Sequence, residues 1–91
     1  MLIVSYDISN DKLRTHFSHY LEKFGTRLQC SVFMIKNSKS VLNNIVNDIE
    51  NRFEKRFTEA DSIMIFNLSE TCKITRFGHS KHDDSDCLFI L

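Results

Sequence analysis

A carboxylate follows the first apolar run of this sequence almost at once. Residues 2–4 have the character of a buried strand, and Asp7 comes shortly after them, just before a helical pattern begins. An acid at such a junction can cap the helix, because it accepts hydrogen bonds from free N–H groups and favours the positive end of the dipole. Ser9, Asn10 and Asp11 already meet that need. A role as metal ligand is therefore an alternative to the structural one for Asp7, since carboxylates with such placement are candidates for functional sites.

The metal that suits a single carboxylate is a hard cation. Mg²⁺, with Mn²⁺ as a substitute, takes one or two carboxylates and completes its coordination with waters and phosphate oxygens. Such an ion would polarise a phosphodiester and lower the pKa of an attacking water. A catalytic role for Asp7 in a nuclease is therefore one hypothesis. Each chain offers a single carboxylate for it.

The net charge differs between the two halves of the chain. Residues 1–40 carry six Lys or Arg against three Asp or Glu, a net charge of +3, whereas residues 41–91 carry six against nine, a net charge of −3. Because phosphate neutralisation requires cations, any nucleic-acid contact would use a local surface of the first half. The candidates for that contact are Lys12, Arg14, Lys23, Arg27, Lys36 and Lys39. An ordinary solvated surface is the alternative for each single lysine.

The elements that must position these side chains can be inferred from periodicity and caps. Apolar residues at helical spacing predict a helix that begins after Ser9 or Asn10 and runs to Phe24, where Gly25 would supply a left-handed stop. Ser38 or Ser40 would open a second helix, whose inner face reaches Phe53. The predicted strands are 2–6, 27–35 and 62–68, with 72–77 as a strand that could pair with 62–68.

This order of elements favours an α+β fold with both helices on one face of a sheet. Residues 27–35 contain no turn residue, so the residues alone predict one strand there rather than a hairpin. The polar stretch 78–86 is expected to be an acidic connector, because the spacing of its His and Asp residues fits neither a zinc signature nor an EF-hand loop. We expect a domain over 1–78 and a connector with a C-terminal strand over 79–91.

Three scattered cysteines, in no CxxC pair, are typical of a reducing compartment rather than of a disulfide framework. The apolar run at the N-terminus is too short and lacks the basic lead-in of a signal peptide, and nothing approaches the length of a membrane span. We therefore expect a cytoplasmic protein without a membrane partner. The apolar tail 87–91 would be an exposed strand edge unless it pairs with a partner sheet.

A strand that ends in Tyr6-Asp7-Ile8, followed by a basic helix, resembles the CRISPR-associated protein 2 family. The specific part of the resemblance is the stretch from Gly25 to Phe33, in which Arg27, Gln29, Ser31 and Val32 stand at the family's spacings. The length and the layout of the second half agree, so the resemblance covers the whole chain. Residues 36–86 match only in pattern. Among the basic candidates the resemblance favours Arg27, which matches the family motif, and Arg14, which matches the basic character of the family's first helix.

The resemblance implies a ferredoxin-like βαββαβ fold with an extra C-terminal strand, and it divides residues 27–35 into two short strands. It implies a homodimer that bridges dimers of the integrase subunit, CRISPR-associated protein 1, and holds duplex protospacer DNA during spacer acquisition. The alternative activity in the family is a metal-dependent endonuclease, with RNA as a further substrate and Asp7 as ligand. The expected interface residues are Phe33, which could equally be core, and the tail residues Cys87, Leu88, Phe89, Ile90 and Leu91.

Overall fold

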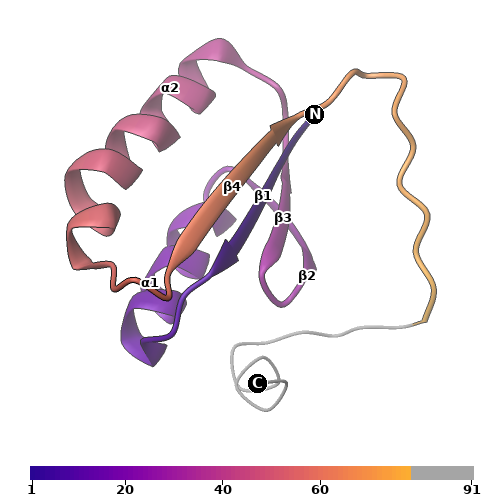
Figure 1. Cartoon of the computed structure of the whole chain (residues 1–91). Coiled ribbons are helices and arrows are strands. Elements are labelled where there is room, and N and C mark those ends of the chain that lie inside the picture. The colour runs from indigo at the N-terminus through magenta and orange to yellow at the C-terminus, as the bar shows by residue number, and fades with distance from the viewer. Residues whose placement is uncertain (79–91) are drawn as a thin grey trace.

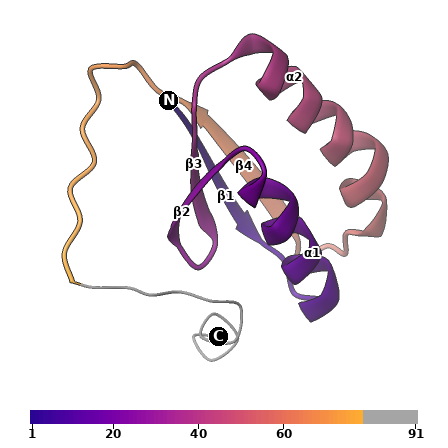
Figure 2. The same ribbon diagram turned by 180° about the vertical axis from the view of Figure 1, so that it is seen from behind.

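The computed structural model describes residues 1–78 as two helices packed on one face of a four-stranded antiparallel sheet (Figures 1 and 2). The strand order is β2-β3-β1-β4. This arrangement confirms the expected α+β, ferredoxin-like βαββαβ fold. The elements are β1 (Leu2–Asp7), α1 (Asp11–Glu22), β2 (Gly25–Gln29), β3 (Val32–Ile35), α2 (Lys39–Asp48), the π-helical turn η1 (Ile49–Phe53), the 3₁₀ turn η2 (Glu54–Arg56) and β4 (Ser62–Asn67). The proposed connector and C-terminal strand, 79–91, lie outside the described residues.

The core lies between the sheet and the helices. Leu2, Val4 and Tyr6 alternate along β1 and are buried against the helices, whereas the intervening residues of β1 face the opposite side. Phe17 at the centre of α1 is fully buried and contacts Phe53 of η1. The aromatic side chains of the core therefore connect β1, α1 and the end of the second helical run.

Both helices begin at one of the residues that the sequence offered as a cap. The side chain of Asn10 accepts a hydrogen bond from the Leu13 N–H at 2.9 Å, and Ser38 caps α2 through the Val41 N–H. The second helical run continues through η1 and η2 to Arg56, which places Phe53 in the core as its spacing predicted.

The prediction of one strand over 27–35 is wrong, because β2 and β3 form a hairpin joined at Cys30 and Ser31. Contacts from elsewhere in the chain stabilise this turn. The Cys30 carbonyl accepts hydrogen bonds from the Tyr6 hydroxyl at 3.1 Å and from Arg27 at 2.9 Å, and the Tyr6 N–H donates to the Ser31 carbonyl. The division of this stretch that the family resemblance implied is therefore the correct one.

Gly25 does not stop α1 in the left-handed conformation that the sequence suggested. The helix ends at Glu22 and is closed by the Phe24 N–H, which donates to the Leu21 carbonyl at 2.9 Å. Within residues 1–78 the one positive φ belongs to Gly78. Gly25 instead opens β2, where a Cβ atom would lie 2.1 Å from the Met34 carbonyl oxygen. The glycine is therefore required by the close approach of two strands.

The predicted strand over 72–77 does not form in the described part of the chain. Residues 69–78, here termed the arm, contain no strand and run away from the sheet beyond β4 (Figure 1). Two large apolar side chains of the arm are exposed: Ile74 by 41% and Phe77 by 92%. Within residues 1–78, β4 pairs with β1 alone, so the arm does not use the outer edge of β4.

Candidate functional site

Asp7 is the last residue of β1 and lies opposite Ser62 of β4. The alternation of β1 places its exposed side chain on the side of the sheet that carries no helix. This side, the open sheet face, consists of Ile3, Ser5, Asp7, Val32, Met34, Ser62, Met64 and Phe66. The Asp7 carboxylate forms no side-chain hydrogen bond or ion pair with any other residue of 1–78. It is therefore available to a ligand at the end of an otherwise mostly apolar face.

The turn that follows Asp7 is held from two sides. Arg14 donates to the Ile8 carbonyl at 2.9 Å and also pairs with Asp11 at the start of α1. From the other side, Asp61 accepts hydrogen bonds from the Ser9 N–H at 2.8 Å and from the Ser9 hydroxyl at 2.9 Å. These contacts fix the backbone directly after Asp7, so the carboxylate is presented from a rigid strand end.

The metal-binding capacity of one chain is small. In the part of the chain that the structure describes, no group of three or more His, Cys, Asp or Glu side chains is placed to hold an ion. A closed, all-protein cage does not fit this site. A hard cation that keeps most of its waters does fit, since Mg²⁺ is commonly held by one or two carboxylates together with phosphate oxygens. Asp7 supplies one such carboxylate.

The two arginines among the predicted phosphate contacts lie largely inside the structure. The Arg14 side chain is 11% exposed and is bonded to Ile8 and Asp11. The Arg27 side chain is also 11% exposed; it lies 5.0 Å above the Phe33 ring and pairs with Glu22 at 3.3 Å. Both guanidinium groups therefore support the local fold, and little of either surface is left for a phosphate.

The lysines of the predicted set have the opposite character. Lys12, Lys23, Lys36 and Lys39 are all exposed. None of the four forms an ion pair within residues 1–78. The acids at the two ends of α1, Asp11 and Glu22, are paired with the two arginines, whose side chains are largely buried. Lys12 on α1 and Lys23 directly after it therefore carry charges that these two acids do not offset.

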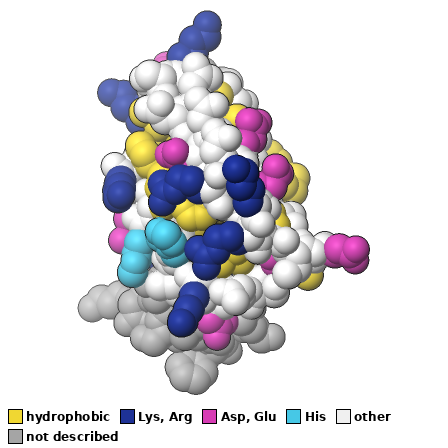
Figure 3. Space-filling model, turned by 90° about the vertical axis from the view of Figure 1, so that its left-hand side faces the viewer, with side chains coloured by type: hydrophobic (Ala, Val, Ile, Leu, Met, Phe, Trp, Pro, Cys, Tyr) yellow, Lys and Arg dark blue, Asp and Glu magenta, His cyan; other side chains and the backbone are white. Residues whose placement is uncertain are grey.

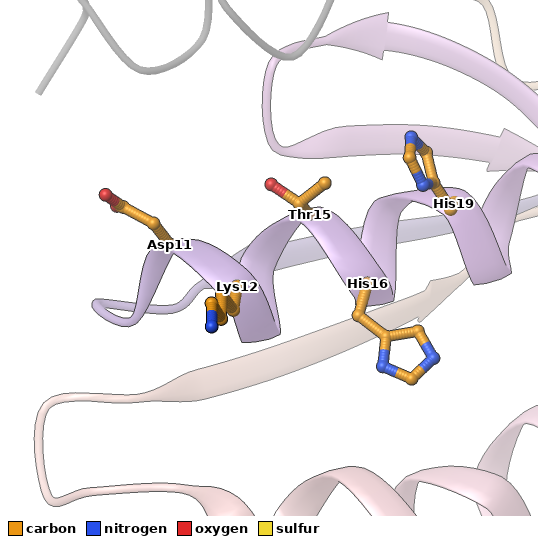
Figure 4. Close-up of a pocket in the computed structure, with 5 residues that line it drawn as sticks. All are labelled: Asp11, Lys12, Thr15, His16 and His19. Atoms are coloured by element: carbon orange, nitrogen blue, oxygen red, sulfur yellow. The ribbon is translucent and has the colours of Figure 1, made fainter.

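A surface depression of about 420 Å³ runs along α1. Its lining residues are Asp11, Lys12, Thr15, His16 and His19 (Figure 4). The side chains diverge: Asp11, Thr15 and His19 point to one side of the helix, whereas Lys12 and His16 point to the other. Because they do not converge on one point, they form an extended polar strip rather than a closed ligand pocket.

Sequence reasoning missed the basic residues of the second helical run. Arg52, Lys55 and Arg56 are exposed and follow α2 directly. They were overlooked because they belong to the half of the chain with a net charge of −3. The signal that could have found them is the local run NRFEKRF, where three cations stand within five positions. Net charge over half a chain does not describe a surface, because a fold brings both halves together.

Phe33, expected as core or as interface, is fully buried within the single chain, where it stacks on Tyr6 and underlies Arg27. Its ring therefore belongs to the core that one chain forms by itself.

The tail residues expected at a partner interface, 87–91, lie outside the described residues. Within 1–78, no helix has both the length and the apolar character needed to cross a membrane.

Asp61 gives the turn after Asp7 a pH dependence. Hydrogen bonds from the Ser9 and Thr58 N–H groups to the ionised carboxylate lower the pKa of Asp61 below its ordinary value of 3.8. A lowered folded-state pKa stabilises the fold above the unfolded value, and this stabilisation is lost as the pH falls through the folded value. We expect Asp61→Asn to lower the urea midpoint of unfolding at pH 7 and to differ less from the wild type as the pH falls below 3.8.

The measurement is urea denaturation of both proteins across this pH range. Glu59→Gln is the matched control, because Glu59 is an exposed neighbouring acid without a side-chain partner in 1–78. An Asp61→Asn deficit of the same size at every pH would contradict the assignment.

Comparisons with known proteins agree with one another. The family model described as CRISPR associated protein Cas2 matches residues 1–76. The CRISPR-associated endoribonuclease Cas2 2 of Methanospirillum hungatei is 31% identical over 88 residues, with 90% of each chain covered. Streptococcus pyogenes Cas2, solved at pH 6.5, aligns with a TM-score of 0.59 at 25% identity over 77% of this chain and 87% of that one. A hypothetical protein of Thermus thermophilus, TT1823, shares the fold with a TM-score of 0.69 at 22% identity, over 87% and 93%.

Proposed function

The chain belongs to the CRISPR-associated protein Cas2 family, and on this basis we propose that it serves spacer acquisition as a homodimer that binds duplex protospacer DNA and bridges integrase subunits. The observation that carries the DNA-binding part is the charge distribution of α1. Its acids at both ends are paired with buried arginines, while Lys12 and Lys23 remain exposed without an ion-pair partner in 1–78. Such lysines suit contacts that position a duplex without reading its sequence.

The open sheet face supports the homodimer. Met64 and Phe66 are 56% and 41% exposed there, beside the apolar side chains of Ile3 and Met34 in the same register. Contiguous exposed apolar side chains on a small domain mark interaction surfaces. A second copy related by a two-fold axis would cover this face and bring two Asp7 carboxylates to one interface. The arm, with Ile74 and Phe77 exposed, offers strand pairing to the same partner.

The test of the proposal is the salt dependence of duplex binding. Each phosphate contact contributes about 0.9 to the slope of log affinity against log salt for duplex DNA. We expect Lys12→Gln with Lys23→Gln to reduce that slope by up to about 1.8 per chain, because two neutralising charges are removed. Fluorescence anisotropy over a salt series measures it. Lys12→Arg with Lys23→Arg keeps the charges and should keep the slope.

A wild-type chain that binds no duplex would overturn the proposal. An unchanged slope in the glutamine variant would remove α1 from the contact surface. Bridging of the integrase subunit, CRISPR-associated protein 1, is measured separately by co-purification with the wild-type chain.

A second candidate function is a metal-dependent endonuclease, with RNA as the substrate that the name of the Methanospirillum hungatei relative suggests. The specific observation in its favour is the exposed Asp7 carboxylate, which has no side-chain partner in 1–78 and lies at a strand end. Asp7 would hold Mg²⁺ or Mn²⁺, and the bound ion would activate a water and polarise the scissile phosphodiester. The contacts of Ile8 and Ser9 would keep the carboxylate oriented.

A further inference from the structure

A histidine of α1 and an arginine of the second helical run meet at the Phe53 ring. His16 of α1 approaches this ring edge-on at 5.6 Å, and the Arg52 guanidinium lies 5.1 Å from its centroid. Arg52 also lies 5.8 Å from the Tyr20 ring, so it leans over α1. Lys55 and Arg56 follow directly in η2, and both are exposed. We term Lys12, His16, Arg52, Lys55 and Arg56 the Phe53 basic surface.

Some of the neighbouring acids are engaged by other groups. Asp11 is paired with Arg14. Asp48 accepts a hydrogen bond of 2.5 Å from the Tyr20 hydroxyl, whose pKa is raised by burial and by this carboxylate. The remaining acids of this region are Glu50, Glu54 and Glu59, all exposed. Lys, Arg and His side chains occupy the middle of the helical side of the molecule, whereas most of its acids lie toward an edge (Figure 3).

Arg52 is partly ordered before any ligand arrives. A guanidinium held over two aromatic rings by cation–π contacts loses less conformational freedom on binding than a free side chain does. The planar group keeps donors that suit phosphate oxygens. Lys55 and Arg56 have no ion-pair partner in the described residues, so their charges are available to an anionic ligand.

We infer that the Phe53 basic surface contacts the phosphodiester backbone of a nucleic acid and extends the contact surface from α1 across to η1 and η2. This inference rests on the proposed nucleic-acid binding. Continuity favours a nucleic acid over an acidic protein, because Lys12 belongs both to this surface and to the proposed duplex contacts of α1. A backbone that runs from α1 to η2 would cross cations contributed by both halves of the chain.

The test removes two charges that form no ion pair within the described residues. We expect Lys55→Gln with Arg56→Gln to lower the salt slope of binding by up to about 1.8 per chain for duplex DNA and about 1.4 per chain for single-stranded RNA of matched length. Comparison of the two probes shows whether the surface binds duplex DNA or single-stranded RNA. Lys55→Arg with Arg56→Lys preserves both charges and should bind as the wild type does. Urea midpoints of all variants should stay equal, because these side chains are exposed.

The possible results separate the Phe53 basic surface from the proposed function. An unchanged slope in Lys55→Gln/Arg56→Gln, with a reduced slope in Lys12→Gln/Lys23→Gln, would overturn this surface and leave the proposed function standing. A wild-type chain that binds neither probe would overturn both. Binding to polyglutamate but to neither nucleic acid would assign the surface to an acidic protein and overturn the inference.

Discussion

Phe17→Ala should lower the free energy of unfolding by about 3–5 kcal/mol, the usual cost of removing a buried aromatic ring. Phe17 is fully buried, and its ring centroid lies 5.1 Å from that of Tyr6 and 4.9 Å from that of Phe53, in edge-to-face geometry. Its ring therefore joins the strand that carries Asp7, the helix that carries the lysines and the turn beneath the basic surface. A loss of this size approaches the whole stability of a small domain.

The measurement is urea denaturation at neutral pH, followed by circular dichroism. Phe17→Leu is the matched control, since it keeps an apolar side chain and leaves a smaller cavity, and it should cost clearly less. Phe66→Ala is a second comparison, because a single chain leaves the Phe66 ring 41% exposed on the open sheet face, whereas it buries the Phe17 ring fully. A Phe17→Ala loss below about 1 kcal/mol would mean that the aromatic core is not packed as described.

Periodicity predicted the features that depend only on residues close to one another in the sequence. The apolar spacing of α1 and α2 and the two caps, Asn10 and Ser38, required only local information. The β2–β3 hairpin did not follow from the residues, because its turn at Cys30 and Ser31 contains no glycine, proline or asparagine. Hydrogen bonds from Tyr6 and Arg27 stabilise that turn, and the first of them spans 24 residues of sequence.

The candidate site shows the same limit in its charges. The sequence identifies Arg14 as a cation but does not tell whether the guanidinium faces water or the Ile8 carbonyl. Lys12 and Lys55 are also more than forty positions apart in the sequence. In the structure, their two helical runs meet where His16 and Arg52 contact the Phe53 ring. The position of Asp7 at a strand end before a helix was predictable because both features are local, whereas its role as a metal ligand stays a prediction.

Asp7→Ala should lower metal-dependent RNA cleavage by more than about 100-fold if the chain is a nuclease, since even the loss of a group that only hydrogen-bonds a metal ligand costs about 10- to 100-fold. Asp7 is exposed and forms no side-chain bond within 1–78, so the fold and duplex binding should persist. Labelled RNA and duplex DNA would be incubated with Mg²⁺, with Mn²⁺ and with chelator. Asp7→Asn, which keeps the shape but removes the charge, should behave like the alanine variant, and Glu59→Gln should behave like the wild type.

The same cleavage assay also tests whether two chains share one metal ion. If a two-fold axis brings two Asp7 carboxylates to one ion, the activity that remains in a mixture of wild-type and Asp7→Ala protomers should follow the square of the wild-type fraction, because mixed dimers are inactive. A linear loss would mean that each chain holds its own ion. If the wild type cleaves nothing with any metal while duplex binding stays intact, Asp7 has no catalytic role and the DNA-binding proposal stands alone. Cleavage that survives Asp7→Ala would place the chemistry elsewhere.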